Sequence, residues 1–146
     1  MINRIMAAVA ADYPELLILW EASVRASHHF LPEQQIIDLR EPILQHYFPA
    51  VQLMVWRDEA GTAQGFIGVH QGNIEMLFVA PDAQGKGVGS GLLRYAVEHL
   101  QATQVDVNEQ NPAALGFYQH HGFVVNSRSE LDGQGNPYPL LHLALP

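Results

Sequence analysis

The most constraining feature of this sequence is a glycine-rich segment placed between an apolar run and a helical pattern, VAPDAQGKGVGSGLL at 79–93. Gly85, Gly87, Gly89 and Gly91 recur at every second position. Each glycine weakens a helix by about 1 kcal/mol relative to alanine. A chain that begins a helix in this way requires the glycines for another purpose.

Three familiar glycine motifs do not fit this segment. A Walker loop requires Ser or Thr after its lysine, but Lys86 is followed by a glycine. A dinucleotide fingerprint that starts at Gly85 requires a glycine where Ser90 stands. A hydrolase elbow around that serine requires glycines in place of Val88 and Leu92. The sequence therefore disfavours all three classes.

The order strand, glycine-rich loop and helix favours an anion-binding site. A helix N-terminus offers unpaired N–H groups and about half a positive charge. Glycines let a bulky anion approach the backbone, while Lys86 adds a cation and Gln84 adds donors. These features suit a pyrophosphate. On spacing alone, an ordinary glycine-rich turn remains an equal alternative.

Composition excludes several functional classes. The chain has 146 residues, the size of one domain, and we expect a single domain over 1–146. A net charge of −8 argues against a nucleic-acid partner and mildly favours a cationic substrate. The absence of cysteine excludes disulfides, a cysteine nucleophile and thiolate metal sites. We find no signal peptide and no apolar run long enough for a bilayer, so we expect a cytoplasmic protein that does not bind membranes.

Hydrophobic periodicity predicts an order of β-α-α-β-β-β-α-β-α-β-β. Asp12 and Glu15 resemble a capping box for the first helix, and Pro42 interrupts the second. Asn111 is expected to cap the last helix, which ends near Gly122. The predicted strands cover 2–9, 51–56, 63–70, 74–80, 104–108, 123–129 and 138–145. Hairpins together with a crossover helix indicate an α/β (α+β mixed) fold with a mixed sheet.

The glycine segment and its surroundings resemble the GNAT family of N-acetyltransferases. QGKGVG at 84–89 fits the family signature [RQ]-x-x-G-x-[GA], and the segments MLFVAPD and FYQHHGF are also typical of it. WEASVRASHHFL, VNEQNPAALGFY and PYPLLHLA are similar to small bacterial members of the YjaB-like kind. The resemblance covers essentially the whole chain. It implies a mixed, mostly antiparallel, V-shaped sheet flanked by helices, and transfer of the acetyl group of acetyl-CoA to an amine.

The resemblance also implies where acetyl-CoA is held. Its pyrophosphate would lie on the backbone of 84–90, and its pantetheine arm would pair with the main chain of Leu77 and Val79. Asn108 is equally well a turn residue, and Asn111 equally well a helix cap. The cofactor-binding residues that we expect are Leu77, Phe78, Val79, Gln84, Gly85, Lys86, Gly87, Val88, Gly89, Ser90, Asn108 and Asn111.

Two residues are candidates for catalysis. Tyr118 matches the family's general acid for the leaving thiolate, although it could simply pack beside neighbouring phenylalanines. Glu75 shares the side of Leu77 if the strand alternates regularly, and a carboxylate in an apolar strand could act as base through water or make a structural bond. Asn73 stands where many relatives carry an acidic residue. Without cysteine the transfer should be direct, and the N–H of Leu77 or Val79 could polarise the thioester carbonyl.

The segment WEASVRASHHFL provides the predicted acceptor wall. Trp20, Ser23, His28 and His29 combine aromatic surface with hydrogen-bonding groups, as binding pockets do. The alternative is a connection between helices with surface histidines. We expect no metal site, because no H-E-x-x-H motif occurs.

Two functions from different classes follow. The first is an acetyl-CoA-dependent N-acetyltransferase that acts on a primary amine of a small molecule or peptide, as a monomer or homodimer. The second is a CoA-binding sensor or interaction module without catalysis, which the asparagine at position 73 leaves open.

Overall fold

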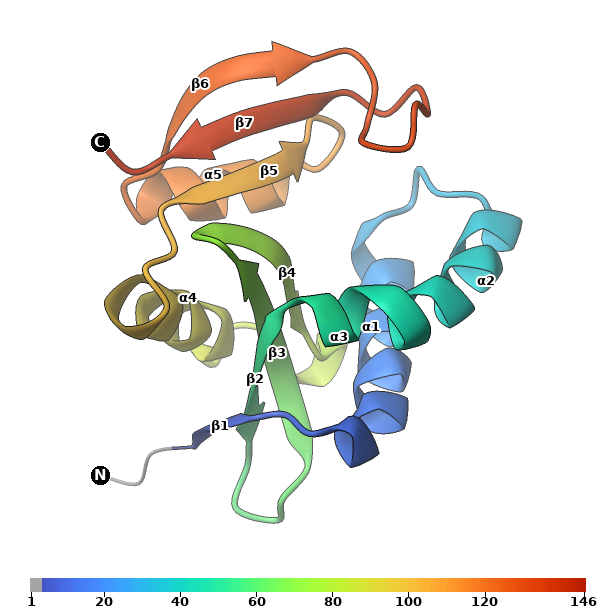
Figure 1. Cartoon of the computed structure of the whole chain (residues 1–146), viewed down its shortest axis with the longest axis vertical. Coiled ribbons are helices and arrows are strands. Elements are labelled where there is room, and N and C mark those ends of the chain that lie inside the picture. The colour runs from blue at the N-terminus through green and yellow to red at the C-terminus, as the bar shows by residue number, and fades with distance from the viewer. Residues whose placement is uncertain (1–3) are drawn as a thin grey trace.

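The computed structural model describes residues 4–146 and contains one seven-stranded sheet in the order β1-β2-β3-β4-β5-β7-β6 (Figure 1). Within these residues β4 and β5 are the one parallel pair, and the other neighbours are antiparallel. The predicted mixed sheet is confirmed. The first predicted strand is shorter than expected, and its positions 2 and 3 lie outside the described residues. The strands are β1 Ile5–Ala7, β2 Gln52–Arg57, β3 Ala63–His70, β4 Asn73–Val79, β5 Gln104–Asn108, β6 Val124–Ser129 and β7 Leu140–Ala144.

Helices follow the predicted order. They are α1 Tyr13–Ser27, α2 Glu33–Pro42, α3 Phe48–Ala50, α4 Val88–His99 and α5 Pro112–His120. The predicted interruption at Pro42 is confirmed, because a π-helical turn over Ile43–Tyr47 follows it and leads into α3. Proline has no N–H to continue the regular hydrogen-bond ladder. In the described part of the chain, no helix is both long and apolar enough to span a membrane.

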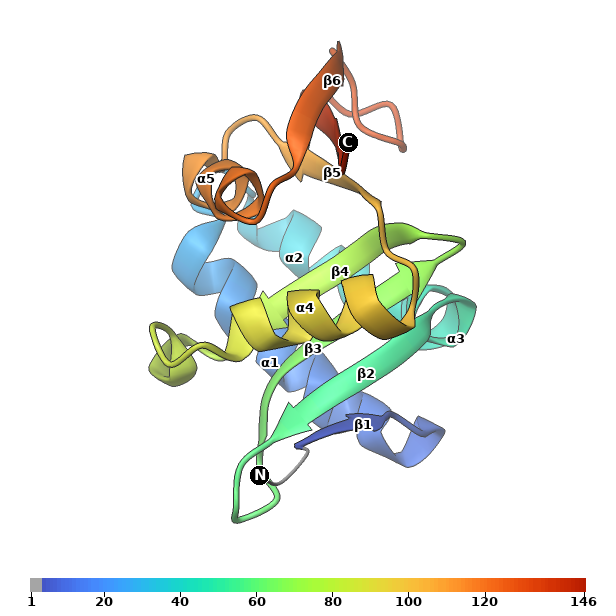
Figure 2. The same ribbon diagram turned by 90° about the vertical axis from the view of Figure 1, so that its left-hand side faces the viewer.

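Helices cover both faces of the strands β2 to β4. Figure 2 shows α4 across one face, with α1 behind the same strands. Leu92 of α4 packs in the core on the first face, and Leu16 of α1 packs against the second with Phe66 of β3. All three side chains are fully buried, and each such burial contributes about 1.5–3 kcal/mol. The two helices therefore fix the position of β4 from both sides.

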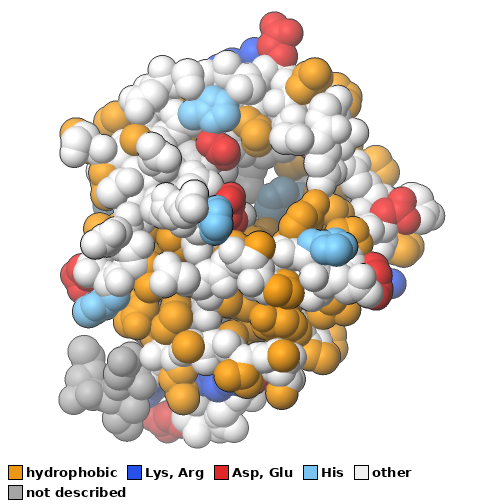
Figure 3. All heavy atoms as spheres, viewed as in Figure 1, with side chains coloured by type: hydrophobic (Ala, Val, Ile, Leu, Met, Phe, Trp, Pro, Cys, Tyr) orange, Lys and Arg blue, Asp and Glu red, His pale blue; other side chains and the backbone are white. Residues whose placement is uncertain are grey.

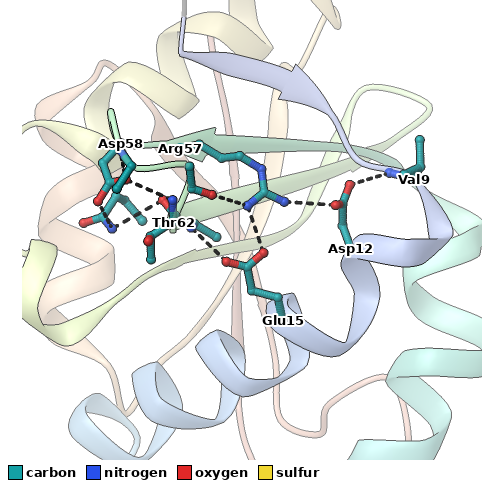
Figure 4. A network of polar contacts seen from close by, with 10 residues as sticks. Val9, Asp12, Glu15, Arg57, Asp58 and Thr62 are labelled. Carbon is teal, nitrogen blue, oxygen red and sulfur yellow. Dashed lines mark hydrogen bonds and ion pairs between the residues drawn. The ribbon is translucent and has the colours of Figure 1, made fainter.

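An ion-pair network fixes the start of α1 to the β2–β3 hairpin (Figure 4). The Arg57 guanidinium lies 2.8 Å from a carboxylate oxygen of Glu15 and 3.0 Å from one of Asp12. Glu15 also accepts from the Ala63 N–H, which with Arg57 holds the pKa of this carboxyl below its usual range. The capping-box prediction is wrong: Asp12 accepts from the Val9 N–H at 2.8 Å, and its side chain makes no cap bond to α1. Both carboxylates serve tertiary contacts instead.

The sheet parts between β4 and β5. These strands pair only at Asn73 with Gln104 and at Ile74 with Val105. Beyond Ile74 the two halves diverge, and Figure 1 shows β5, β6 and β7 as a separate upper layer. The predicted V-shaped sheet is confirmed.

Candidate active site

The glycine segment forms the loop before α4 and its first turn. Gly85 and Gly87 have φ values of +77° and +82°, a region that L side chains rarely adopt. Gly87 is the N-cap of α4, and the Gly91 N–H makes the first helical bond to its carbonyl at 2.9 Å. The intervening N–H groups of 88–90 are therefore available to a ligand.

The other two glycines have different roles. A Cβ on Gly91 would lie 2.3 Å from a ring carbon of Trp56 in β2, so this glycine allows α4 to approach the sheet closely. A Cβ on Gly89 would lie at an ordinary 3.5 Å from Val79. The repeated glycines therefore combine backbone conformation, close packing and an open helix end.

A cleft of about 550 Å³ extends along this helix end. Its walls come from α1, β4, the glycine segment and α5. All of the predicted cofactor-binding residues except Lys86 and Asn108 line this cleft. Asn108 lines a second, smaller cavity, whereas Lys86 is exposed and lines neither. The predicted residues that the cleft brings together are Leu77, Phe78, Val79, Gln84, Gly85, Gly87, Val88, Gly89, Ser90 and Asn111.

The edge of β4 that faces this opening carries main-chain groups that no other strand pairs, and of these the Val79 carbonyl accepts a hydrogen bond from the Gln84 side-chain amide at 3.5 Å. The Ala80 N–H donates to the Gln64 carbonyl of the β3 side at 2.8 Å. Because hydrogen-bonded positions alternate along an antiparallel ladder, Phe78 is paired to β3, and the N–H and C=O of Leu77 and Val79 point away from it. These groups face the gap between β4 and β5.

Glu75 lies at a β-bulge that sequence reasoning missed. Gly68 pairs with Met76 and Val69 with Ile74, so Glu75 has no partner in β3. The bulge interrupts the alternation on which we placed Glu75 beside Leu77. Its side chain is exposed rather than enclosed by apolar residues, and it accepts a hydrogen bond from the Asn73 amide at 2.8 Å. It lines a smaller cavity of about 130 Å³.

Tyr118 is at the junction of the cleft and the smaller cavity and lines both. Only 7% of the residue is exposed, and burial raises the pKa of its hydroxyl. Its ring packs edge-on against Phe117 and Phe123, so the packing role that the sequence offered as an alternative to acid catalysis is also present. Within residues 4–146 the hydroxyl makes no hydrogen bond, and its oxygen is not fully buried, because every fully buried side-chain oxygen or nitrogen in these residues has a partner. It is therefore available to a ligand.

The two asparagines combine structural bonds with a place at the cavities. Asn111 caps α5, because its side-chain oxygen accepts from the Ala114 N–H at 3.2 Å, and it lines both cavities. Asn108 accepts from the Gln110 N–H at 2.9 Å in a turn and lines the smaller cavity. The cap at Asn111 is confirmed, as is the helix end before Gly122, which has a φ of +94°.

The predicted acceptor wall is only partly assembled. Ser23 and His28 line the cleft, and His28 also lines the smaller cavity. Trp20 is 4% exposed in the core beneath α1, and His29 is exposed, so neither reaches these cavities. The apolar periodicity of this helix already indicated a buried position for Trp20. The structure confirms that burial, so Trp20 belongs to the core and not to an aromatic pocket wall.

His28 connects α1 with α5 across the cleft. Its Nδ1 lies 2.8 Å from the Ser27 hydroxyl, and its Nε2 lies 3.5 Å from the Asn111 amide nitrogen. Burial, with a smaller effect of the neighbouring His29, lowers the pKa of His28. The imidazole is therefore neutral near pH 7.

Sequence reasoning missed three polar residues of the outer strands. Asp106 lines the smaller cavity and is bonded to His142, which in turn is bonded to Ser129. Only Asp106 occupies a polar position in a strand whose sequence alternates, QVDVN, and this was the available signal. The three side chains are close together because of the register between their strands, which the sequence alone does not reveal. Figure 3 shows the surface hollowed between the two halves of the sheet, with acidic and histidine side chains around the hollow. Across the described chain, no group of three metal-binding side chains is assembled.

Comparisons with known proteins agree with this geometry. Residues 49–125 match the family described as acetyltransferase (GNAT) domain. The chain is 39% identical to the peptidyl-lysine N-acetyltransferase YjaB of Escherichia coli (strain K12) over 89% of this chain and 88% of that protein. The solution structure of apo-form YjaB from Escherichia coli superposes with a TM-score of 0.88 at 36% identity, covering 99% of this chain and 97% of that one.

A structure at lower identity shares the fold. The PaiA N-acetyltransferase from Thermoplasma acidophilum, solved in complex with coenzyme A, has a TM-score of 0.78 at 17% identity, with both chains fully covered. The family match spans more than half of this chain, and the E. coli relative matches along nearly all of it. The chain thus belongs to the GNAT family, and it is an N-acetyltransferase that transfers an acetyl group to an amine.

Proposed function

We propose that this chain is a single N-acetyltransferase domain that moves the acetyl group of acetyl-CoA directly to the side-chain amine of a lysine in a peptide or protein. The observation that carries the proposal is the meeting of two cavities where β4 parts from β5. Relatives named peptidyl-lysine N-acetyltransferase support lysine as the acceptor. The residues that line both cavities are His28, Leu77, Phe78, Asn111, Ala114 and Tyr118.

The cleft fits the cofactor that the family uses. The N–H groups of 88–90 and the positive end of α4 suit a pyrophosphate. Apart from adjacent residues of the chain, no heavy atom lies within 4 Å of where a Cβ on Gly85 or Gly87 would stand. The main-chain groups of Leu77 and Val79 suit the amides of a pantetheine arm, which would run along β4 as an added strand. Lys86, exposed beside the loop, adds long-range attraction for the phosphates.

Acetyl-CoA supplies the acetyl group as a thioester. The N–H of Leu77 or Val79 donates to the carbonyl oxygen, where negative charge develops. The amine nitrogen bonds to the carbonyl carbon as the carbon–sulfur bond breaks, and Tyr118 donates its proton to the leaving sulfur. Glu75 takes up the proton that the amine loses, through water. We expect no covalent enzyme intermediate, because the junction of the two cavities would hold both substrates together.

The environment of Tyr118 suits an acid. Burial raises the pKa of its hydroxyl, so the group is protonated at neutral pH and keeps the proton until thiolate charge develops. The same surroundings raise the pKa of a leaving thiol above its ordinary value of about 8.5. Donor and acceptor therefore shift in the same direction, and proton transfer between them stays possible.

Release of free thiol from acetyl-CoA, measured with a peptide that contains one internal lysine, tests the proposal. We expect turnover with this peptide and none with the same peptide carrying norleucine in place of lysine. If acetyl-CoA binds in calorimetry but neither lysine peptides nor small amines release thiol, the chain is a CoA-binding module and the catalytic proposal is wrong.

Tyr118→Phe tests the acid while keeping the buried ring. A positioned acid accelerates the chemical step by about 10²- to 10⁴-fold. We therefore expect the single-turnover rate constant to fall by that factor, with acetyl-CoA affinity unchanged. Tyr95→Phe is the matched control, because Tyr95 is a tyrosine of α4 that lines neither cavity. Native single-turnover rates in Tyr118→Phe would remove this hydroxyl from the mechanism.

A further inference from the structure

Three polar side chains form a hydrogen-bonded relay across the outer half of the sheet. The Asp106 Oδ1 of β5 lies 2.6 Å from the His142 Nδ1 of β7, and the His142 Nε2 lies 2.6 Å from the Ser129 Oγ of β6. Asp106 and His142 stand opposite each other in the antiparallel ladder. Their neighbours Val105 and Leu143 are buried in the core with α4, so alternation places Asp106 and His142 on the other face.

The relay fixes the orientation of the carboxylate. An ionised carboxylate only accepts hydrogen bonds, so the His142 Nδ1 donates to Asp106. In the neutral imidazole the Nε2 is then an acceptor, and the Ser129 hydroxyl donates to it. Because His142 occupies Oδ1, the Oδ2 of Asp106 is left for another donor. Ser129 and His142 thus hold one carboxylate oxygen and present the other.

The β6–β7 loop keeps this wall in place. The Tyr138 hydroxyl donates to the Gln35 side chain of α2 at 3.0 Å, and the Gln134 amide donates to the Tyr47 hydroxyl at 2.9 Å. Figure 1 shows the loop extending from β6 and β7 toward α2. The hairpin that carries the relay is therefore anchored to the helices on the opposite side of the opening.

The carboxylate end of the relay lies where an acceptor would enter. Asp106 of β5 and Glu75 of β4 line the same smaller cavity, on the two strands that diverge. Five of the six arginines are paired with other carboxylates, and among residues 4–146 neither Asp106 nor Glu75 is paired with Lys or Arg. The cavity is thus an acidic opening without its own cation. Tyr118 is only 7% exposed, and its hydroxyl, which makes no hydrogen bond among residues 4–146, opens onto the same cavity and indicates that a ligand completes it.

We propose that Asp106 binds the positively charged amine of the acceptor and that His142 is the residue that positions it. This inference rests on the proposed function and specifies how that acceptor is selected. The Oδ2 of Asp106 accepts from the ammonium group, and the charge favours lysine over neutral side chains of equal length. Glu75 remains the group that takes up the amine proton through water. Asp106 therefore governs acceptor affinity rather than the rate of the chemical step.

A hydrolase-like use of the same relay is disfavoured. Serine, histidine and aspartate in this order activate a serine nucleophile in hydrolases. Ser129, however, lines neither of the two cavities described above, whereas Asp106 lines one. A bound carbonyl would not reach the Ser129 Oγ. The carboxylate end of the relay, rather than the hydroxyl end, faces the substrate.

Peptide binding provides a test that does not depend on turnover. The lysine peptide and its norleucine counterpart are titrated separately into the CoA-bound native protein and into Asp106→Asn. We expect the native protein to bind the lysine peptide about 10- to 100-fold more tightly, the value of one hydrogen bond to a charged group. We expect Asp106→Asn to lose this preference while its affinity for CoA stays native.

A matched pair of variants tests the positioning role of His142. His142→Asn keeps an amide N–H near the position of Nδ1 and should retain most of the lysine preference. His142→Gln keeps a nitrogen nearer the position of Nε2, loses the donor to Asp106, and should raise KM for the peptide with little change in kcat. Thermal unfolding of both variants separates this effect from a loss of folding, which would affect CoA binding equally.

The outcomes separate this inference from the proposed function. Native protein that binds lysine and norleucine peptides equally well overturns the role of Asp106, whatever the turnover. A lysine preference that survives in Asp106→Asn overturns it as well. A lysine preference that Asp106→Asn removes, without thiol release in the native protein, supports Asp106 and refutes the catalytic proposal instead.

Discussion

Gly91→Ala probes the contact between α4 and the sheet, on which the position of the cofactor cleft depends. A Cβ at this position would lie 2.3 Å from one ring carbon of Trp56, and at 3.1 Å and 3.3 Å from two others. Carbon atoms in contact normally lie about 3.5–4.0 Å apart, so the overlap exceeds about 1 Å. The indole ring or the helix must move to accept a single methyl group.

The magnitude follows from two opposing terms. Overpacking of this kind costs about 1–3 kcal/mol, whereas alanine in place of glycine favours a helix by up to about 1 kcal/mol. Gly89→Ala is the matched control, because it lies in the same turn and its Cβ would make only ordinary contacts at 3.5 Å and 3.7 Å. The helix term largely cancels between the two variants. Gly91→Ala should therefore be less stable than Gly89→Ala by about 1–3 kcal/mol.

Urea unfolding at equilibrium and thermal unfolding measure this difference. At about 2–4 °C per kcal/mol for a chain of this size, a gap of 2 kcal/mol separates the Tm values by about 4–8 °C. Trp56→Leu in the Gly91→Ala background makes space, so the double variant should be more stable than the two single effects predict. Equal stability of Gly91→Ala and Gly89→Ala, with no coupling to Trp56, would refute the packing argument.

Three further predictions concern the cofactor, the hairpin network and pH. Acetyl-CoA at about 100 times its Kd should raise the Tm by about 5–10 °C; Gly87→Glu should abolish this shift, whereas Gly61→Glu, at a similar φ of +86° but in the β2–β3 turn, should keep it. Arg57→Ala removes the network at the start of α1 and should cost about 2 kcal/mol in urea unfolding, less at high salt. Burial lowers the pKa of His28 in the folded protein, so below about pH 6.5 the unfolded chain binds more protons than the folded one and the protein loses stability. His28→Gln should reduce this loss of stability in thermal unfolding between about pH 7 and pH 5.

The sequence predicted those features of the fold that depend on local periodicity. The strand and helix order, the cap at Asn111 and the interruption at Pro42 follow from patterns within a few residues. The capping-box prediction failed because Asp12 and Glu15 bind Arg57, more than forty residues away in sequence. A local pattern cannot reveal a tertiary partner of this kind.

The site was predictable to a similar extent. The proposed cofactor half of the site follows a contiguous motif, and ten of the twelve residues expected there lie along one cleft. Its acceptor half depends on register. The bulge at Glu75 and the alignment of Asp106 with His142 arise from strand pairing between segments far apart in sequence. Alternation in QVDVN placed Asp106 on one face of its strand without showing which residues of other strands it meets.

The gap between β4 and β5 also determines where cofactor affinity originates. The main-chain groups of Leu77 and Val79 face an open cleft. The Gln84 side-chain amide donates to the Val79 carbonyl, and the other groups are open to water before a ligand binds, so the gap carries no penalty for buried unpaired groups. Exchanging water for pantetheine amides gains only about 0.5–1.5 kcal/mol per bond, or about 1–3 kcal/mol for two bonds. Micromolar binding requires about 8 kcal/mol. Most of it must therefore come from charge and burial around the glycine segment, which is why a carboxylate at position 87 should affect acetyl-CoA binding more than any change along the edge of β4.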